Sequence, residues 1–184
     1  MSQLIALIIA IALGAIVTAI GYVFLGDAFT SNSERGVALQ LVNQASQLEM
    51  AMTAYRAAEA APAFDTVNNT FALVNTLLTD EGYLKDGLVA PQGAFDLVEN
   101  NGDVFLVVDD ATANGISQAV CAELANLSGI VPTTDADSDN IGEATVTVGA
   151  ATGAQVDTVL DGARYNCVED VGAATGYVFA YQVD

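Results

Sequence analysis

The stretch that decides the fold is Leu4–Leu25, LIALIIAIALGAIVTAIGYVFL, which contains no charged residue. As an α-helix its 22 residues would be about 33 Å long, enough to cross the hydrocarbon core of a bilayer. A secretory signal peptide is not expected, because no basic residue precedes the stretch and the apolar run is too long for one. The sequence therefore predicts an apolar helix over residues 1–26 that can lie in lipid or against other helices.

The charge of the chain lies outside this stretch. The sequence contains 23 acidic and 4 basic residues and no histidine, which gives a net charge of -19. A surface this acidic repels nucleic acid, so no nucleic-acid partner is expected. The lack of histidine removes the commonest general base and a common metal ligand. The composition therefore argues against an enzyme, and no catalytic residue is predicted.

An amphipathic continuation of the helix is predicted over residues 27–61. Its apolar residues recur at gaps of four and three positions, which places them on one face of a helix: Leu41, Ala45, Leu48, Met52 and Tyr55. Polar residues separate them, as in a helix that lies with one side on a domain. Ser31 and Glu34 have the spacing of a capping box, so a new helix start near residue 31 is an alternative. Pro62 predicts the end of the helix.

Residues 62–184 are predicted to form a globular α+β head. A further helical turn or two is expected over Thr70–Leu78, and a second helix over Ile116–Leu127, ended by Gly129. Asn101 and Gly102 predict a hairpin turn between the runs AFDLV and DVFLVV. Further strands are expected at Ala144–Val148, Val156–Leu160 and Tyr177–Val183. The fold class is therefore α+β: a long N-terminal helix, its apolar half protruding and its amphipathic half packed on a head with an antiparallel sheet and a second helix.

Cys121 and Cys167 are the two cysteines of the chain. An even number of cysteines in a chain that reaches a membrane or the space beyond it favours a disulfide, and two buried thiols in a reducing compartment are the alternative. A bond between them would contribute about 4 kcal/mol in the chain-entropy model.

One acidic segment has the alternating spacing of a calcium loop. Asp135, Asp137 and Asp139 recur at every second residue of TDADSDNIGE, and Glu143 follows. Carboxylates at this spacing can converge on one hard cation. The complete EF-hand pattern is absent, because Asn140 replaces the turn glycine and Val146 the last glutamate. The segment therefore predicts either a calcium site or a solvated acidic loop, and no other cofactor is expected.

Three stretches resemble the type IV pilin family, closest to its type IVb branch. They are MSQLIALIIAIALGAIVTAIGYVF at the N-terminus, ISQAVCAELANLSG around Cys121 and RYNCVEDVGAATGYVFAYQ around Cys167. The resemblance implies a structural subunit of an extracellular filament, a homopolymer at the cell surface. It also implies a disulfide between a helix of the head and a position near the C-terminus. It leaves open whether the filament serves adhesion, motility or DNA uptake.

The resemblance further implies a processing route. A prepilin peptidase would remove a leader and leave Met1 N-methylated, and the subunit would wait in the inner membrane for the assembly machinery. Gly14, Gly21 and Gly26 are where the helix can unwind, since glycine weakens helices. The side chains implied to form the filament core are Leu4, Ile5, Leu7, Ile8, Ile11, Leu13, Ile16, Val17, Ile20, Val23 and Phe24. Ile5 departs from the family, which usually has a glutamate at this position.

Two alternatives to a type IV pilus subunit remain at this point. One is a bitopic membrane-anchored binding domain that works as a monomer and binds calcium or a small ligand. The other is an archaeal pilin or flagellin, for which a helix-poor head of β-sandwich type is expected.

Overall fold

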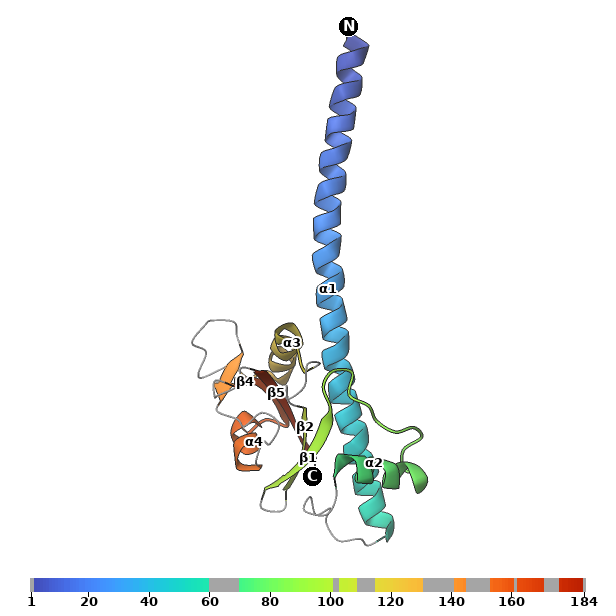
Figure 1. Cartoon of the computed structure of the whole chain (residues 1–184), viewed down its shortest axis with the longest axis vertical. Coiled ribbons are helices and arrows are strands. Elements are labelled where there is room, and N and C mark those ends of the chain that lie inside the picture. Colours follow the sequence, from blue (N-terminus) through green and yellow to red (C-terminus); the bar gives the residue numbers. More distant parts are fainter. Residues whose placement is uncertain are drawn as a thin grey trace. The chain divides into compact units, whose positions relative to one another are not determined.

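The computed structural model describes most of the chain (Figure 1). The described ranges are 2–59, 70–100, 103–108, 115–130, 141–144, 153–160, 162–170 and 176–183, with side chains from Thr30 onward except Glu59 and Asn100. The chain divides into two units, Met1–Glu34 and Arg35–Asp184. The head and its core belong to the second unit.

Helix α1 spans Ser2–Glu59 as one continuous helix. This confirms both the helix predicted over the uncharged stretch and its amphipathic continuation. The alternative of a new helix start at Ser31 is not found, because the backbone is helical on both sides of that residue. Pro62, the predicted stop, lies outside the described ranges.

The second half of α1 packs on the head through the predicted face. Four of the five predicted residues are 0% exposed: Leu41, Ala45, Leu48 and Met52. The fifth, Tyr55, is half-buried, and its ring meets the ring of Tyr83 edge-on with 5.5 Å between centroids. The apolar periodicity therefore identified the side of the helix that faces the core.

Two further predicted helices are present, with shifted ends. Helix α2 spans Phe71–Asp80, longer than the predicted Thr70–Leu78. Helix α3 spans Gln118–Ser128, where the prediction was Ile116–Leu127. Gly129 ends α3 with a φ of 75°, a left-handed conformation that glycine adopts without steric cost.

The segment after α2 is fixed by a turn and by one asparagine. Gly82, with a φ of 79°, lets the amide of Tyr83 donate to the carbonyl of Leu78 at 2.8 Å, as in a Schellman motif. Asn75 of α2 then bonds the backbone of Leu88 twice. Its Nδ2 donates to the Leu88 carbonyl at 3.1 Å, and its Oδ1 accepts from the Leu88 amide at 2.9 Å. Residues 83–88 are thereby held against α2.

Five strands form one sheet in the order β1-β2-β5-β4-β3. Their bounds are Phe95–Asn100 (β1), Asp103–Val108 (β2), Gly142–Ala144 (β3), Tyr165–Asp170 (β4) and Gly176–Val183 (β5). β1 and β2 form the predicted hairpin, with Asn100 opposite Asp103, although the two turn residues lie outside the described ranges. β5 confirms the predicted last strand. Of the strand predicted over residues 144–148, only Ala144 is described, in β3.

The sheet is mixed, whereas the prediction was an antiparallel one. The pairs β1–β2, β2–β5 and β4–β5 are antiparallel, but β3 runs parallel to β4. Parallel neighbours need a long crossover, usually through a helix. The connection from β3 to β4 contains such a helix, α4, over Gly153–Leu160.

Helix α4 overturns the prediction of a strand over residues 156–160. Val156, Val159 and Leu160 are all buried, and their gaps of three and one fit a single helix face. A strand would instead place Thr158 on the same face as Val156 and Leu160. Thr158 is exposed, and its hydroxyl donates back into its own helix at 3.1 Å.

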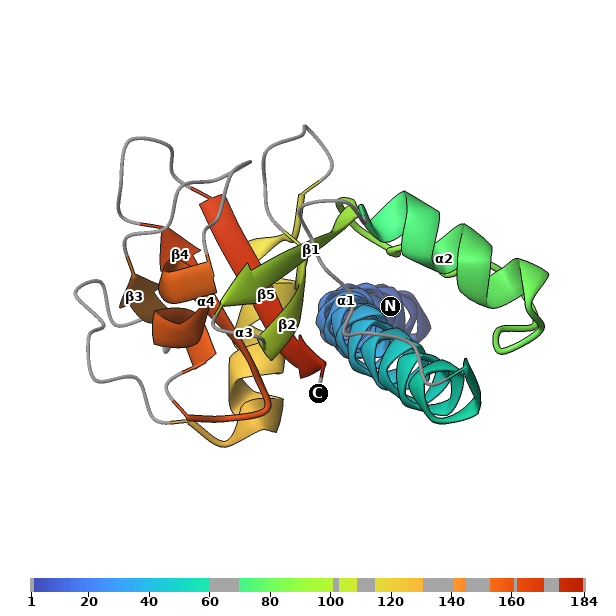
Figure 2. The same ribbon diagram turned by 90° about the horizontal axis from the view of Figure 1, so that it is seen from below.

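The head is built in three layers, with α4 on the side of the sheet opposite α1 and α2 (Figure 2). Successive residues of β2 and β5 point to opposite faces, as strand geometry requires. Leu106 and Phe179 belong to the main core with α1, α2 and α3. Phe105 and Val178 belong to a second core beneath α4. Both faces of the sheet are therefore buried.

Candidate functional site

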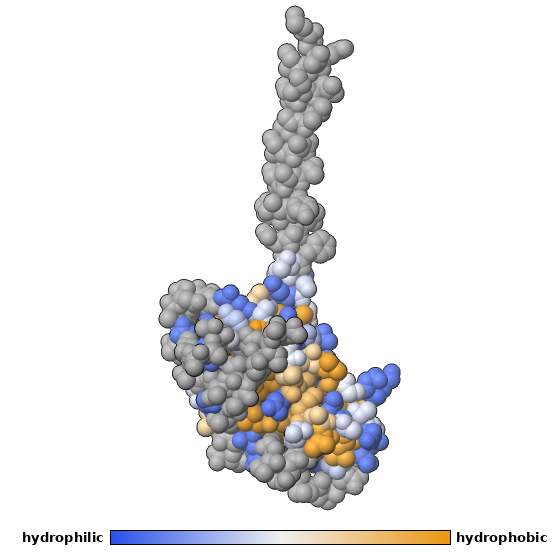
Figure 3. All heavy atoms as spheres, in the orientation of Figure 1, coloured by the Kyte–Doolittle hydropathy of each residue, from blue (hydrophilic) through white to orange (hydrophobic). Residues whose placement is uncertain are grey.

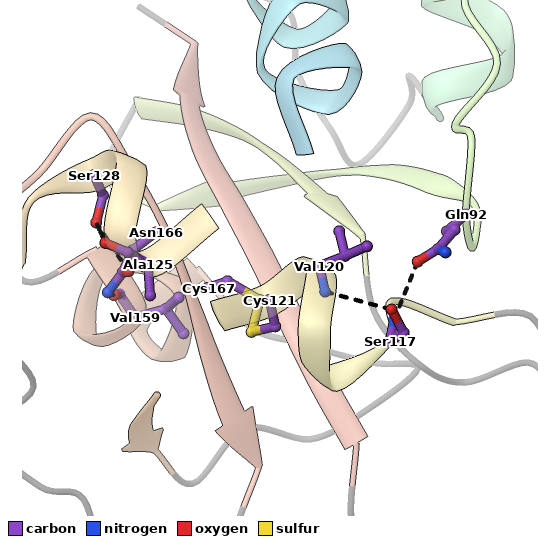
Figure 4. Close-up of a disulfide and its surroundings, with 9 residues drawn as sticks. All are labelled: Gln92, Ser117, Val120, Cys121, Ala125, Ser128, Val159, Asn166 and Cys167. Atoms are coloured by element: carbon purple, nitrogen blue, oxygen red, sulfur yellow. Dashed lines mark hydrogen bonds between the residues drawn. A yellow bond between two sulfur atoms is a disulfide. The ribbon is translucent and has the colours of Figure 1, made fainter. Parts of the chain in front are cut away.

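Cys121 of α3 and Cys167 of β4 form the predicted disulfide (Figure 4). Their Cα atoms are 5.3 Å apart, and both residues are 0% exposed. The bond joins α3 to the sheet across 46 residues of sequence, a span that includes β3 and α4. Because the bond is shielded from solvent, a reductant can reach it only when the head opens.

Asn166, next to the disulfide, links α3, β4 and α4 (Figure 4). The residue is 5% exposed. Its Nδ2 donates to the carbonyl of Val159 at 2.9 Å, and its Oδ1 accepts from the Ser128 hydroxyl at 3.4 Å. Val159 lies in the last turn of α4, where carbonyls have no partner within the helix. Asn166 of β4 therefore supplies a hydrogen-bond donor to a carbonyl at the C-terminal end of α4.

Replacing Asn166 by alanine is expected to lower the free energy of unfolding by about 1–3 kcal/mol, because the Val159 carbonyl loses its donor inside the protein. Chemical denaturation of the full-length chain in detergent measures this change. Asn43→Ala is the control, since Asn43 is exposed on α1 and its removal should cost less than about 0.5 kcal/mol. Equal losses in the two variants would contradict this role of Asn166.

Helix α1 is tied to the C-terminal strand by a cluster of Glu49, Tyr181 and Arg164. The Tyr181 hydroxyl donates to Glu49 Oε2 at 2.7 Å, and Arg164 pairs with Glu49 Oε1. Arg164 also donates from Nε to the Tyr181 oxygen at 3.2 Å, and its guanidinium lies 5.8 Å from the centre of that ring. The Arg164 side chain is 52% exposed, so its ion pair contributes at most about 1 kcal/mol. The bond from the buried Tyr181 to a charged acceptor is the stronger part of the cluster.

The tyrosines of this region predict a loss of stability in alkali. Burial raises the pKa of both Tyr165 and Tyr181 above the ordinary value of 10.0, and the bond to Glu49 raises that of Tyr181 further. The fold favours the neutral phenols, so their contribution is complete below about pH 10 and is lost as the pH rises through the raised values. The midpoint of denaturation, measured from pH 8 to pH 12, should therefore decrease once the pH exceeds about 10. A Tyr165→Phe/Tyr181→Phe variant should show a smaller decrease. If the variant shows the same dependence of the midpoint on pH as the parent, the two tyrosines are not its cause.

A groove runs along the exposed side of α1. Its first part has a volume of about 660 Å³ between residues 36–47 of α1 and residues 84–88. Its second part, about 270 Å³, continues between residues 47–54 and residues 83–85. Gln47, Leu84 and Lys85 line both parts, so we treat them as one feature, the α1 groove. Figure 3 shows apolar residues gathered on the head over the C-terminal part of α1 and over α2.

The α1 groove is rich in amides and poor in charge. Four amide side chains of α1 line it: Gln40, Asn43, Gln44 and Gln47. The Oε1 atom of Gln44 is buried and has no hydrogen-bond partner among the described residues. Lys85 and Asp86 are the charged residues of the lining, and their charges offset each other. The groove is therefore close to neutral on a chain with a net charge of -19.

The structure does not test the predicted calcium site. Asp135, Asp137 and Asp139 lie outside the described residues, and Glu143 is half-buried in β3. Within the described ranges, no group of three or more His, Cys, Asp or Glu side chains is placed to hold a metal ion. Calcium binding therefore stays a prediction from the sequence.

The predicted assembly residues of the leading stretch lie outside the described side chains. This holds for Met1 and for the filament-core set between Leu4 and Phe24. The backbone at Gly14, Gly21 and Gly26 is helical. Where side chains are described, no helix is both long and apolar enough to cross a membrane.

The sequence did not predict the roles of Asn166 and of the Glu49 cluster. Glu49 has the helical position of a polar surface residue. Its partners, Tyr181 in β5 and Arg164 in the turn before β4, lie more than 100 residues away. One signal was present: Glu49 is the only charged residue between Arg35 and Arg56. For Asn166 no such signal exists, because its partners are set by the packing of α3 and α4.

No protein-family model matches the sequence, and no curated protein matches it. Among solved structures, the chain is similar to the major type IV pilin PilA1 from Clostridium difficile, with 14% sequence identity and a TM-score of 0.44. The match covers 84% of this chain and 99% of that one.

Proposed function

We propose that this chain is the structural subunit of an extracellular filament of the type IV pilus class, assembled through its N-terminal helix. Before assembly the uncharged stretch of that helix anchors the subunit in the inner membrane, with Met1 exposed to a prepilin peptidase and N-methylated. After assembly the same stretch, together with its sister copies, forms the filament core. The acidic head forms the outer surface.

The observation that supports this proposal is the composition of one helix, α1. Its leading 22 uncharged residues continue without interruption into a segment whose apolar face is part of the main core of the head. An apolar helix can satisfy its side chains in lipid or against copies of itself at similar cost, so it can leave the bilayer for a helical bundle. A globular head fixed to such a helix would be carried to the surface of the bundle.

One of the two alternatives is supported less well than a type IV pilus subunit. A flagellin-like subunit is expected to have a helix-poor β-sandwich head, whereas this head has α2, α3 and α4 packed on both faces of one mixed sheet. The monomeric membrane-anchored calcium binder stays an alternative, because its candidate ligands Asp135, Asp137 and Asp139 lie outside the described residues.

Electron microscopy of material sheared from cells that express the chain tests the proposal. We expect thin fibres composed of this subunit, with an intact mass one methyl group above that of the mature sequence. Ile11→Asp should abolish the fibres by placing a charge in the uncharged stretch, whereas Thr53→Asp on the exposed face of α1 should leave them intact. Solitary subunits held in the membrane, with no fibres, would favour the bitopic alternative.

The net charge predicts that fibres depend on salt. Subunits with a charge of -19 repel one another, and ions screen this repulsion over about 10 Å at 0.1 M salt. Fibre length, measured by light scattering and microscopy, should therefore increase from about 0.01 M to about 0.5 M sodium chloride. Insensitivity to salt over this range would count against close packing of the acidic heads.

A further inference from the structure

The hydrogen-bonding side chains of the α1 groove are mostly uncharged amides. The groove lies wholly within the second unit, between α1 and residues 83–88. Gln40, Asn43 and Gln47 are exposed along it at gaps of three and four positions, which places their amides on one side of the helix. Each amide carries two donors and one acceptor. A ligand on this side of α1 therefore meets donors and acceptors mixed along its length.

Gln44, which also lines the groove, has an acceptor that lacks a donor. Its Oε1 is buried and has no hydrogen-bond partner among the described residues. A buried acceptor left without a donor costs about 1–3 kcal/mol, and a hydroxyl group that donates to it removes that cost. The groove is therefore suited to a ligand that donates hydrogen bonds as well as accepting them.

Apolar surface lies among the amides. Leu39 and Met50 line the groove and are 43% and 61% exposed. Tyr83 lines the second part of the groove, and its ring is supported edge-on by the ring of Tyr55. An aromatic ring offers apolar contact area together with a polar tip. A sugar ring is complementary to such a lining, because its hydroxyls bond amides at its edge while its C–H groups pack on apolar side chains.

The wall of the groove opposite α1 is held in place by the fold. Asn75 binds both backbone groups of Leu88 through hydrogen bonds. Gly87, in the same wall, allows this close approach, since a Cβ added there would lie 3.3 Å from Asn75 Nδ2. A wall that is fixed in advance lowers the entropy cost of binding. Asn75 is therefore a positioning residue for the groove.

Charge argues against other classes of ligand. The net charge of -19 repels nucleic acids and acidic polymers, and Lys85 is the one basic residue of the groove lining. Helical peptides are usually bound in grooves lined mainly by apolar side chains, and phosphorylated or acidic peptides by clusters of arginine. The lining of the α1 groove is of neither kind. An uncharged ligand rich in hydroxyl groups fits it better.

We propose that the α1 groove binds a neutral polysaccharide, a chain of uncharged hexoses that lies along α1 from Gly36 to Ala54. This length of helix is about 27 Å, which leaves room for several sugar units. The amides of α1 bond the sugar hydroxyls, and Met50 and Tyr83 pack on the ring faces. The inference goes beyond the proposed function, because it concerns a single subunit and does not require that fibres form.

Lys85 can report whether the groove is occupied. It is the only lysine of the chain, so an amine-reactive reagent labels the groove at one side chain, which peptide mass spectrometry quantifies. The full-length chain, in a detergent without sugar groups, is titrated with linear hexasaccharides of glucose, of mannose or of N-acetylglucosamine. At least one of these should protect Lys85 from labelling, and the protection should saturate. Protection by none of them would overturn the inference, as would equal protection by an oligogalacturonate or by an uncharged glycine–serine peptide.

Removal of two amides tests whether the sugar contacts α1. In the Asn43→Ala/Gln47→Ala variant, the sugar concentration that gives half of the full protection should rise about tenfold or more, because two hydrogen-bonding side chains are lost. Asn126→Ala is the matched control, since Asn126 is exposed on α3 outside the groove lining, and its half-protection concentration should equal that of the parent. Equal melting temperatures in the same detergent verify that both variants fold. A double variant that binds as tightly as the parent would overturn the inference.

Discussion

Replacing both Cys121 and Cys167 by alanine is expected to lower the free energy of unfolding by about 4 kcal/mol, since the bond closes a long loop in the unfolded chain. The sequence separation of 46 residues sets this magnitude in the chain-entropy model. A domain of this size is typically stable by about 5–15 kcal/mol, so the loss removes a large share of the total. Denaturant unfolding of the full-length chain in detergent, with and without the substitutions, measures the change.

The matched control is Val120→Ala, which shortens a 0% exposed side chain of the same helix but removes no crosslink. It should cost about 1–2 kcal/mol and leave the dependence on denaturant unchanged. Loss of the disulfide should also steepen that dependence, because an uncrosslinked chain exposes more surface when it unfolds. A double variant no less stable than Val120→Ala would show that α3 and β4 are held together by packing alone.

Leu48→Ala is expected to cost about 2–5 kcal/mol, because Leu48 is 0% exposed in the main core where α1 meets the sheet and α3. The deleted methyl groups leave a cavity that the rigid layers on both sides cannot fill. Thermal and denaturant unfolding of the full-length chain in detergent both report this loss. The second unit should become less stable as a whole, since α1 residues 38–52 and the strands share one core.

Leu39→Ala is the control on the same helix. Leu39 is 43% exposed and lines the α1 groove, so its loss should cost less than about 1 kcal/mol. Similar stability losses at the two positions would contradict the division of α1 into a core face and an open face.

The local pattern of the sequence determined much of this protein. The absence of charge over residues 4–25 and the periodicity from Leu41 to Tyr55 predicted a helix and its buried side, because both properties belong to consecutive residues. The hairpin followed from Asn101 and Gly102 between two apolar runs, and the end of α3 from Gly129. The two cysteines allowed one pairing within the chain.

Only the tertiary structure decided the rest. Strand β4 was missed because its sequence, YNCVED, is polar, and its polar Asn166 is tolerated inside because α3 and α4 supply its hydrogen-bond partners. Residues 156–160 have good strand propensity, but their burial against the sheet follows the helical period of Val156, Val159 and Leu160. The resulting crossover makes β3 parallel to β4. The bonds of Glu49 likewise depend on segments far apart in sequence, and no local pattern encodes which distant groups folding will bring together.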